Sequence, residues 1–201
     1  MDIKNLTPGG FASNYFLVTE GKDAVLVDCS APAADVLTAL RETGAVLHAI
    51  LLTHGHFDHL LTLADVKAKT GARIYLSRED RDLPSDGEKN AYAVIFGADK
   101  TYPEADVLFD DGDTLTFGAL SLRVMHTPGH TRGSSLFLCG DIAFTGDTIF
   151  AAGYGRYDLY GGDPQMLAAS LKKIAALNDS TVLYPGHGEN ATLAEALSRL
   201  Y

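Results

Sequence analysis

The sequence has few cysteines, no long apolar run and comparatively few basic residues, and each shortage excludes a class of protein. Only Cys29 and Cys139 occur in 201 residues, far apart and inside apolar segments, so a disulfide framework is not expected. Apolar runs such as residues 49–52 are far shorter than the roughly 18 residues that a membrane-spanning helix needs. Residues 1–4 lack the basic region that opens an export signal, which predicts a cytoplasmic protein.

The charge balance is acidic, with 16 lysines and arginines against 26 aspartates and glutamates and a net charge of −10. Nucleic-acid binding selects for clustered basic side chains, so this balance argues against such a partner. Hydrophobic residues make up 46% of the chain, which is enough to build a packed core. The length predicts one domain over residues 1–201, because chains begin to divide only beyond about 250–300 residues. The oligomeric state is left open.

Strands and helices alternate in the first third of the sequence. Residues 23–28 and 45–53 are apolar enough to form buried strands. Between them we expect a helix that is capped by Ser30 and closed by Gly44. After them a second helix is predicted over residues 58–70.

The remaining sequence predicts strands and then helices. Residues 77–106 are irregular and are interpreted as an excursion able to cover a site. Several short strands are expected within residues 107–145. A helix capped by Asp163, a strand over residues 181–184 and a last helix from about Thr192 complete the pattern. Helices at both ends and strands in each half predict an α/β fold with sheets inside and helices outside.

Residues 54–59, His-Gly-His-Phe-Asp-His, hold the most informative pattern in the chain. On a helix, His54 and His56 would diverge by about 200° and could not bind one metal ion. At the end of a strand, in a turn that contains a glycine, they can point the same way. Asp58 and His59 are neighbours that would face a different point. The spacing therefore indicates two metal ions.

Three later segments each place a metal-ligand residue beside a glycine at the end of an apolar strand, where glycine permits converging loops to approach closely. With the first motif they make seven candidate ligands, more than one zinc site uses. Two metal ions about 3.5–4 Å apart that share a carboxylate accommodate all seven. The predicted first ion binds His54, His56 and His130, and the second binds Asp58, His59 and His187, with Asp147 as the bridge.

These residues resemble the metallo-β-lactamase superfamily. The motif at 54–59, Thr-Pro-Gly-His ending at His130, Gly-Asp at Asp147 and Gly-His at His187 follow in the family's order. The resemblance implies a four-layer αββα sandwich with a binuclear metal site at one edge, between the two sheets. It also implies that Asp28, at the end of an early strand, orients the metal ligands.

Residues 144–156, Phe-Thr-Gly-Asp-Thr-Ile-Phe-Ala-Ala-Gly-Tyr-Gly-Arg, resemble the glyoxalase II branch, including its small bacterial relatives, and the related persulfide dioxygenases. The resemblance implies that Arg156 holds an anionic part of the substrate, since arginine binds a carboxylate through two N–H groups. Tyr154, where many relatives have cysteine, is predicted to contact substrate at the mouth of the site. Glyoxalase II commonly has glutamate and tyrosine after the last histidine, whereas Gly188 and Glu189 stand here, which leaves the thiol of the substrate open.

The predicted activity is hydrolysis of a small thioester, a reaction similar to that of glyoxalase II. Two divalent ions, zinc in the first place and iron or manganese as alternatives, would lower the pKa of a bridging water. Asp58 is expected to orient the resulting hydroxide as well as to bind metal. A thiolate with a pKa of about 8.5 leaves without a strong acid. The expected partner is a small molecule, with no membrane or nucleic acid involved.

Three alternatives use the same residues. An iron-dependent persulfide dioxygenase would hold one iron on His54, His130 and Asp147. A lactonase would share every metal ligand with a thioesterase, so only a screen of substrates separates the two. A metal-binding scaffold without catalysis would keep the ligands and hydrolyse nothing.

Overall fold

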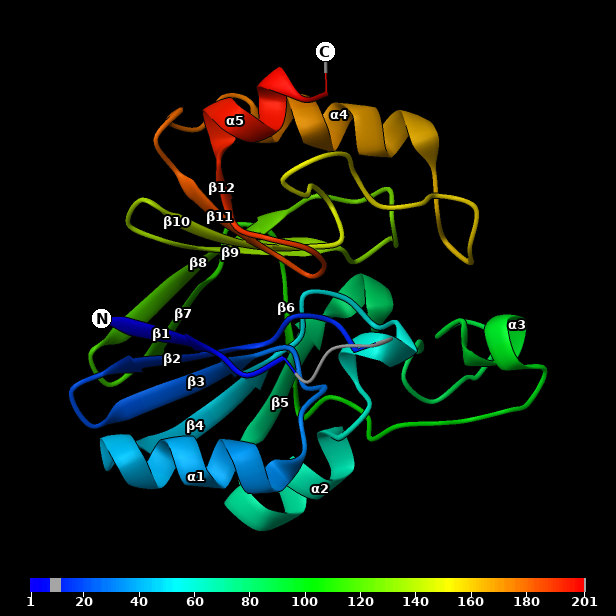
Figure 1. Ribbon diagram of the computed structural model, residues 1–201. Coiled ribbons are helices and arrows are strands. Elements are labelled where there is room, and N and C mark those ends of the chain that lie inside the picture. The colour runs from blue at the N-terminus through cyan, green and yellow to red at the C-terminus, as the bar shows by residue number, and fades with distance from the viewer. Residues whose placement is uncertain (8–11, 201) are drawn as a thin grey trace.

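The computed structural model describes residues 1–7 and 12–200, and its two β-sheets are stacked between helices (Figure 1). The layers run helix, sheet, sheet, helix. This arrangement confirms the expected αββα architecture. Among the described residues, no helix combines the length and the apolar character needed to cross a membrane.

The first sheet is mixed. Its six strands pair in the order β1 (Asp2–Asn5), β2 (Phe16–Glu20), β3 (Asp23–Val27), β4 (Val46–Leu51), β5 (Arg73–Ser77) and β6 (Val107–Phe109). The first three strands pair antiparallel, and β3 to β6 run parallel. Parallel neighbours need crossover connections. Helices supply two of the three, α1 (Ala33–Thr43) before β4 and α2 (Leu63–Thr70) before β5, and residues 78–106 connect β5 to β6.

The second sheet is mostly antiparallel. Its strands pair in the order β12 (Ala191–Thr192), β11 (Val182–Pro185), β10 (Ile142–Gly146), β9 (Ser135–Cys139), β8 (Leu120–His126) and β7 (Thr114–Phe117). Only β10 and β11 run parallel. Two helices, α4 (Pro164–Ile174) and α5 (Leu193–Ser198), cover the outer face of this sheet (Figure 1).

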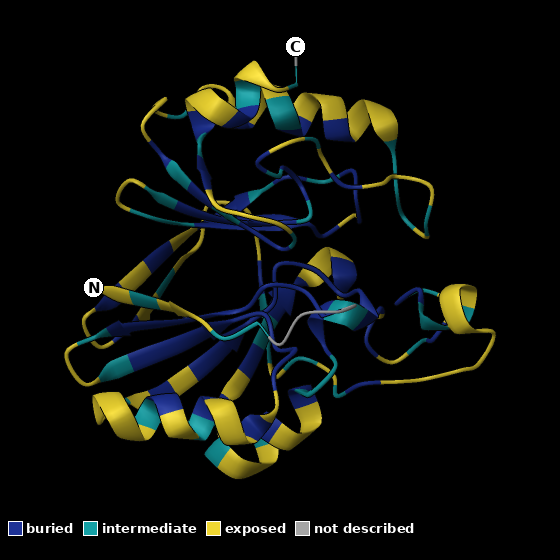
Figure 2. Ribbon diagram, in the orientation of Figure 1, coloured by how far each residue is buried: buried dark blue, intermediate teal, exposed yellow. Residues whose placement is uncertain are grey.

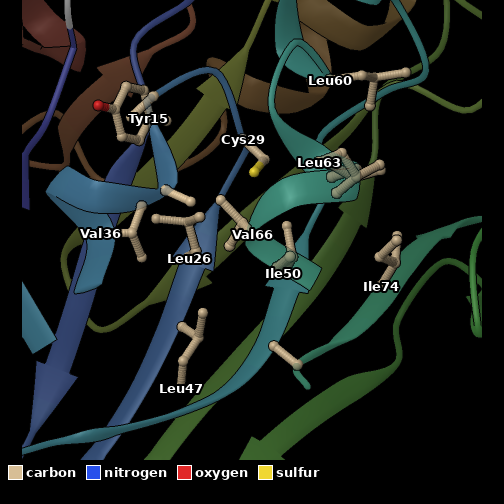
Figure 3. Packing of buried hydrophobic residues seen from close by; sticks show 14 of the residues in the cluster. Tyr15, Leu26, Cys29, Val36, Leu47, Ile50, Leu60, Leu63, Val66 and Ile74 are labelled. Carbon is tan, nitrogen blue, oxygen red and sulfur yellow. The ribbon is translucent and has the colours of Figure 1, made fainter. Parts of the chain in front are cut away.

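Apolar side chains fill the space between successive layers. Phe16 and Leu51 of the first sheet meet Phe137 and Phe144 of the second, and each such buried side chain contributes about 1.5–3 kcal/mol. On the outer face of the first sheet, Val36 of α1 and other side chains of α1 and α2 pack against the strands (Figure 3). Figure 2 shows the consequence, with helices buried on the face toward the sheets and exposed on the other.

Local signals explain where the helices end. In α4, the Asp163 side chain accepts hydrogen bonds from the N–H groups of Gln165 and Met166, and Pro164 occupies the first turn, as predicted. α1 ends at Gly44, whose φ of 65° suits glycine. In α5, a capping box joins Thr192 and Glu195.

The cap expected at Ser30 is wrong. α1 starts after Pro32 and has no side-chain cap. The hydroxyl of Ser30 instead donates a hydrogen bond to the carbonyl oxygen of Asp58. The serine is therefore used to fix the loop that follows β4, and this contact takes it away from the helix.

The helix predicted over residues 58–70 is also wrong at its start. Residues Phe57–His59 form a 3₁₀ turn, and α2 begins only at Leu63. Leu60 and Thr62 have φ values of −120° and −119°, outside the helical range. The helical spacing of apolar residues nevertheless extends across this break. The reason is that the 3₁₀ turn and α2 pack against the same core. The predicted end before Gly71 is confirmed.

Residues 77–106 form no strand after Ser77, the last residue of β5. They contain a 3₁₀ turn at Arg78–Asp80 and the short helix α3 (Tyr92–Phe96). α3 lies at the side of the molecule where the loops beyond the strands gather (Figure 1). The strand predicted at 181–184 is β11, shifted by one residue.

Candidate metal centre

The predicted ligands gather at one edge of the sandwich. His54 and His56 follow β4 in the first sheet, and Asp147 and His187 follow β10 and β11 in the second. The carboxyl ends of neighbouring parallel strands open at the same edge of a sheet. Residues far apart in sequence therefore reach one point between the sheets.

Three buried histidines form the first group. The Nε2 atom of His130 lies 2.9 Å from Nδ1 of His56 and 3.2 Å from Nε2 of His54. The three candidate ligand atoms lie within 4.8 Å of one another. The structure thus brings together the residues that the sequence assigned to a first metal ion.

Four residues form the second group: Asp58, His59, Asp147 and His187. The Nε2 atom of His187 lies 3.1 Å from Oδ2 of Asp58 and 3.5 Å from Oδ2 of Asp147. The Nε2 atom of His59 lies 3.3 Å from Oδ1 of Asp147. The side chain of His187 is 39% exposed, so this group is open to solvent on one side.

Asp147 faces both groups, since its Oδ2 atom also lies 3.7 Å from Nε2 of His130. Three buried atoms here have no hydrogen-bond partner among the described residues: Nε2 of His56, Nε2 of His59 and Oδ1 of Asp147. Buried polar atoms are seldom left unpaired, because the loss of water is costly. Imidazole and carboxylate donors of this kind fit divalent metal ions, which would satisfy Nε2 of His59 and Oδ1 of Asp147, whereas His56 faces its group through Nδ1.

The protonation states of two histidines in the first group suit a metal ion. Burial lowers the pKa of His56 to about 3 and holds that of His54 well below its usual range. Both imidazoles are therefore neutral near pH 7, the form that binds metal. Without an ion, the carboxylates of Asp28 and Asp147 outweigh burial and raise the pKa of His59, and the charge of His59 in turn outweighs burial and lowers the pKa of Asp147. A metal ion on Nε2 of His59 would take the place of that proton.

Asp28 holds His59 in place. Its Oδ2 atom accepts a hydrogen bond from Nδ1 of His59 at 2.8 Å, and its Oδ1 atom accepts one from the N–H of Thr53 at 2.9 Å. With Nδ1 engaged, Nε2 of His59 is turned toward the second group. The φ of Asp28 is 59°, which is uncommon for a residue other than glycine, and its side-chain hydrogen bonds hold it there. This contact with His59 is compatible with the predicted role of Asp28 in orienting a metal ligand, which stays a prediction.

Two glycines allow the backbone to approach Asp147. A Cβ atom on Gly186 would lie 2.2 Å from Oδ1 of Asp147 and 2.7 Å from Cε1 of His59. A Cβ atom on Gly155 would lie 1.9 Å from the carbonyl oxygen of Asp147. A side chain at either position would displace residues of the centre.

Sequence reasoning missed Asp80, which is completely buried. Its Oδ2 atom accepts hydrogen bonds from the N–H of Gly55 at 3.1 Å and the hydroxyl of Thr131 at 2.7 Å. Its Oδ1 atom accepts one from the N–H of Gly133 at 2.7 Å. Asp80 therefore ties the turn that carries two histidines of the first group to the loop that carries the third. Its partners are two backbone N–H groups and one hydroxyl, all distant in the sequence, so no spacing in the sequence indicates this role.

A cavity of about 180 Å³ opens onto both groups. Its lining comprises His56, Phe57, Asp58, Ala91, Ile95, His130, Asp147, Arg156 and Leu159. Ala91 and Ile95 belong to the irregular segment 77–106. That segment thus covers part of the centre, as expected.

The two predicted substrate contacts lie in different places. Arg156 lines the cavity above the ligands, and its guanidinium donates two hydrogen bonds of 2.7 Å to the carboxylate of Asp158. Tyr154 lines a separate cavity of about 330 Å³ beside Leu167 and Leu171 of α4. It is absent from the described lining of the cavity above the ligands. The tyrosine pairs with Ile149 in an isolated bridge, and it lines this second cavity beside α4; its contact with a substrate stays a prediction.

A comparison with known protein families matches residues 8–187 to the metallo-beta-lactamase superfamily. The chain belongs to this superfamily. Two bacterial relatives span most of it. The probable metallo-hydrolase YqgX of Bacillus subtilis is 32% identical over 88% of this chain and 85% of its own. The hydroxyacylglutathione hydrolase GloC of Haemophilus influenzae is 30% identical over 97% of this chain and 94% of its own.

Solved structures of the superfamily share the whole fold. The BLEG-1 B3 metallo-beta-lactamase has a TM-score of 0.92 and 32% identity, covering 98% of this chain and 97% of its own. TTHA1623, solved in a di-iron-bound form, has a TM-score of 0.82 and 34% identity, covering 97% and 96%. ETHE1 from Myxococcus xanthus has a TM-score of 0.80 and 28% identity, covering 97% and 81%.

Proposed function

We propose that this member of the superfamily is a metal-dependent hydrolase of small thioesters, similar to glyoxalase II. The observation that carries the proposal is the pair of ligand groups that share Asp147 beneath a small cavity. Two adjacent divalent ions assist hydrolysis at a carbonyl carbon. The name of GloC, a hydroxyacylglutathione hydrolase, supports an acyl-thiol substrate.

In this proposal each metal ion is bound by its own group of residues. His54, His56 and His130 hold one ion, and Asp58, His59 and His187 hold the other, with Asp147 shared between them. Zinc suits this donor set, and so do iron and manganese. The di-iron-bound form of TTHA1623 supports iron as an alternative to zinc.

Bound ions would supply a water of lowered pKa and an electrophilic contact for the substrate carbonyl. Asp58 lines the cavity, and its Oδ2 atom lies 3.1 Å from Nε2 of His187, so its carboxylate is placed to orient an attacking water. Water adds to the acyl carbon, the carbon–sulfur bond breaks, and a carboxylic acid and a thiol are released.

The leaving group favours a thioester over an amide. A thiolate with a pKa of about 8.5 departs without a proton, whereas an amine needs one. The ionisable groups in the described lining of the cavity are four candidate ligands and Arg156, which is paired with Asp158. No side chain of that lining is free to act as the acid. This favours a thioester over the β-lactam that the name of BLEG-1 implies for that protein.

A second candidate function depends on the metal. If one iron binds to His54, His130 and Asp147, an oxygen-dependent persulfide dioxygenase becomes the better description. The proximity of Asp147 to His130, at 3.7 Å, is compatible with that smaller set. A lactonase or a scaffold without catalysis would use the same residues.

Elemental analysis and activity assays on the purified protein test the proposal. We expect two metal ions per chain and hydrolysis of an acyl thioester, with no oxygen uptake on glutathione persulfide. Asp147→Ala should lose bound metal and lower turnover by more than about a hundredfold. Asp110→Ala, which removes an exposed carboxylate paired with Arg78, is the matched control and should retain both.

The other outcomes are distinct. Full turnover by metal-free protein or by Asp147→Ala would contradict the proposal. One iron per chain with oxygen uptake would favour the dioxygenase. Hydrolysis of lactones alone would favour the lactonase, and two metals without any activity would favour the scaffold.

A further inference from the structure

We infer that the thiol portion of the substrate carries no net negative charge, and is a small neutral or cationic thiol rather than an anionic peptide thiol such as glutathione. This inference rests on the proposed thioesterase function. It concerns the part of the substrate that extends away from the metal centre. Two cavities that share Leu159 carry it.

The inner cavity is too small for a whole peptide thioester. Its volume of about 180 Å³ is below the ~300–1,000 Å³ of ordinary small-molecule pockets. Ala91 and Ile95 wall it on one side, and Leu159 stands beside Arg156 in its lining. An acyl group and the reacting bond fit there. The rest of the thiol must therefore extend past the rim.

A second cavity of about 450 Å³ shares Leu159 with the first and lies against α3. Its other described lining residues are Glu88, Ala93, Val94, Asp158 and Tyr160. This described lining holds two carboxylates and no basic side chain. Asp158 is paired with Arg156, so Glu88 supplies the negative charge that is not balanced. A thiol that carries carboxylates would be repelled by like charge here. An apolar thiol would contact the apolar side chains, and a cationic thiol would be attracted by the negative charge.

The positive charge of Arg156, the residue expected to hold an anionic group, is already balanced by the carboxylate of Asp158. The Nε and Nη2 groups of Arg156 donate hydrogen bonds of 2.7 Å to the carboxylate of Asp158, which occupies one of the two edges through which a guanidinium binds a carboxylate. The two side chains are 52% and 60% exposed, so the pair itself adds little stability. The Arg156–Asp158 pair affects a substrate through its net charge. The pair presents no net positive charge where the inner cavity meets the outer one.

Other cations near this rim do not line it. Lys89 and Arg132 lie 5.6 Å and 5.8 Å from the centre of the Tyr160 ring. The Nζ atom of Lys89 is also 3.3 Å from Oδ2 of Asp86. Neither cation belongs to the described lining of the two cavities. Neither forms an ion pair with Glu88 among the described residues, so the carboxylate of Glu88 faces the outer cavity without a balancing charge.

Three acetyl thioesters that differ only in the thiol test this inference on the metal-loaded protein. The thiols are glutathione, N-acetylcysteamine and thiocholine, which are anionic, neutral and cationic. Release of each thiol gives kcat/KM. We expect the neutral and cationic esters to be hydrolysed at least about twofold more efficiently than the glutathione ester at low salt. The preference should shrink in about 0.5 M salt, because exposed charges are screened.

Two variants test which residues set the preference. In Asp158→Asn and Glu88→Gln, kcat/KM for the glutathione ester relative to the neutral ester should rise about two- to fivefold. The same ratio for the thiocholine ester should fall, with the change in KM rather than in kcat. Asp110→Asn is the matched control, because it breaks an exposed Arg–Asp pair of the same two-bond geometry with Arg78. This control should change neither the ratio for the glutathione ester nor the ratio for the thiocholine ester.

The outcomes separate the inference from the proposed function. If the protein hydrolyses the esters but prefers glutathione, or if neither ratio moves in the two variants, the inference is overturned and the thioesterase stands. If metal-loaded protein hydrolyses no ester, the proposed function is contradicted, and so is the inference that depends on it. Opposite shifts for the anionic and cationic esters support the inference, since a loss of folding would lower both together.

Discussion

The carboxylate of Asp80 is buried between two loops that carry the histidines of the first ligand group. Burial raises its pKa, and three hydrogen bonds from Gly55, Thr131 and Gly133 oppose that rise. Asparagine has the same shape but only one acceptor oxygen. In Asp80→Asn, at least one donor therefore faces an NH₂ group and is left unpaired.

We expect Asp80→Asn to lower the free energy of unfolding by about 1–3 kcal/mol and to weaken metal binding by the first group about 10- to 100-fold. Urea denaturation and the metal retained after dialysis against a weak chelator measure the two effects. Thr131→Val removes one of the three hydrogen bonds and should give a smaller loss of both. Retention of both metals at wild-type affinity by Asp80→Asn would show that Asp80 does not position the centre.

The contrast between Asp80 and the candidate ligands explains what the sequence could predict at this scale. Each ligand is a histidine or aspartate near a glycine at a strand end, so residue type and position both indicate it. Asp80 is recognised only through its partners, which lie 25 to 53 residues away. Tyr154 is the reverse case. An aromatic residue near the site predicts a contact with the substrate, but the structure places Tyr154 in the lining of a separate cavity beside α4, so that contact stays a prediction.

Asp106 links three elements of the first sheet and its helical cover. Its carboxylate accepts hydrogen bonds from Nζ of Lys67 in α2 at 2.6 Å and from the N–H of Ile74 in β5 at 2.8 Å. Burial alone would raise the pKa of Asp106, but these two partners outweigh it and lower that pKa. A carboxyl group with a lowered pKa in the folded state stabilises the fold above its unfolded pKa. That stabilisation is lost as the pH falls through the folded pKa.

Asp106→Asn should therefore reduce the free energy of unfolding near pH 7 by about 0.5–1 kcal/mol, a value reduced for solvent screening. The difference from the wild type should vanish as the pH falls from about 5 toward 2. Denaturation of metal-free protein across this range measures it. Asp65→Asn breaks an exposed pair with Lys69 in α2 and should change stability by less than about 0.5 kcal/mol. A pH-independent effect of Asp106→Asn would contradict the electrostatic explanation.

At the scale of elements, the sequence predicted helices well where a local signal decided their ends. Asp163 and Gly44 are such signals, and α4 and α1 begin and end there. The prediction failed around Ser30 and at residues 58–62, where the loop after β4 decides the local structure. There Ser30 binds the carbonyl of Asp58, and a 3₁₀ turn turns Asp58 and His59 toward the second group. Contacts between distant segments outweighed local preference at both places.

At the scale of the molecule, the centre joins the two sheets. His54, His56 and His59 come from loops of the first sheet, whereas His130 and Asp147 come from loops of the second. The sequence could predict two halves, since each half carries strands and helices. How the two halves pack together depends on the apolar side chains that are buried between the sheets. Those side chains can be identified only when the pairing of the strands is known.

Because each half supplies part of the ligand set, metal ions should stabilise the whole fold. A ligand present at about a hundred times its Kd stabilises the folded state by about 2.7 kcal/mol. For a chain of this length, we expect a chelator to lower the Tm by roughly 5–10 °C. Scanning calorimetry with and without chelator measures the shift, and Asp147→Ala should abolish it while Asp110→Ala retains it. An equal Tm with and without chelator in the wild type would mean that metal ions do not link the two sheets, whatever their part in catalysis.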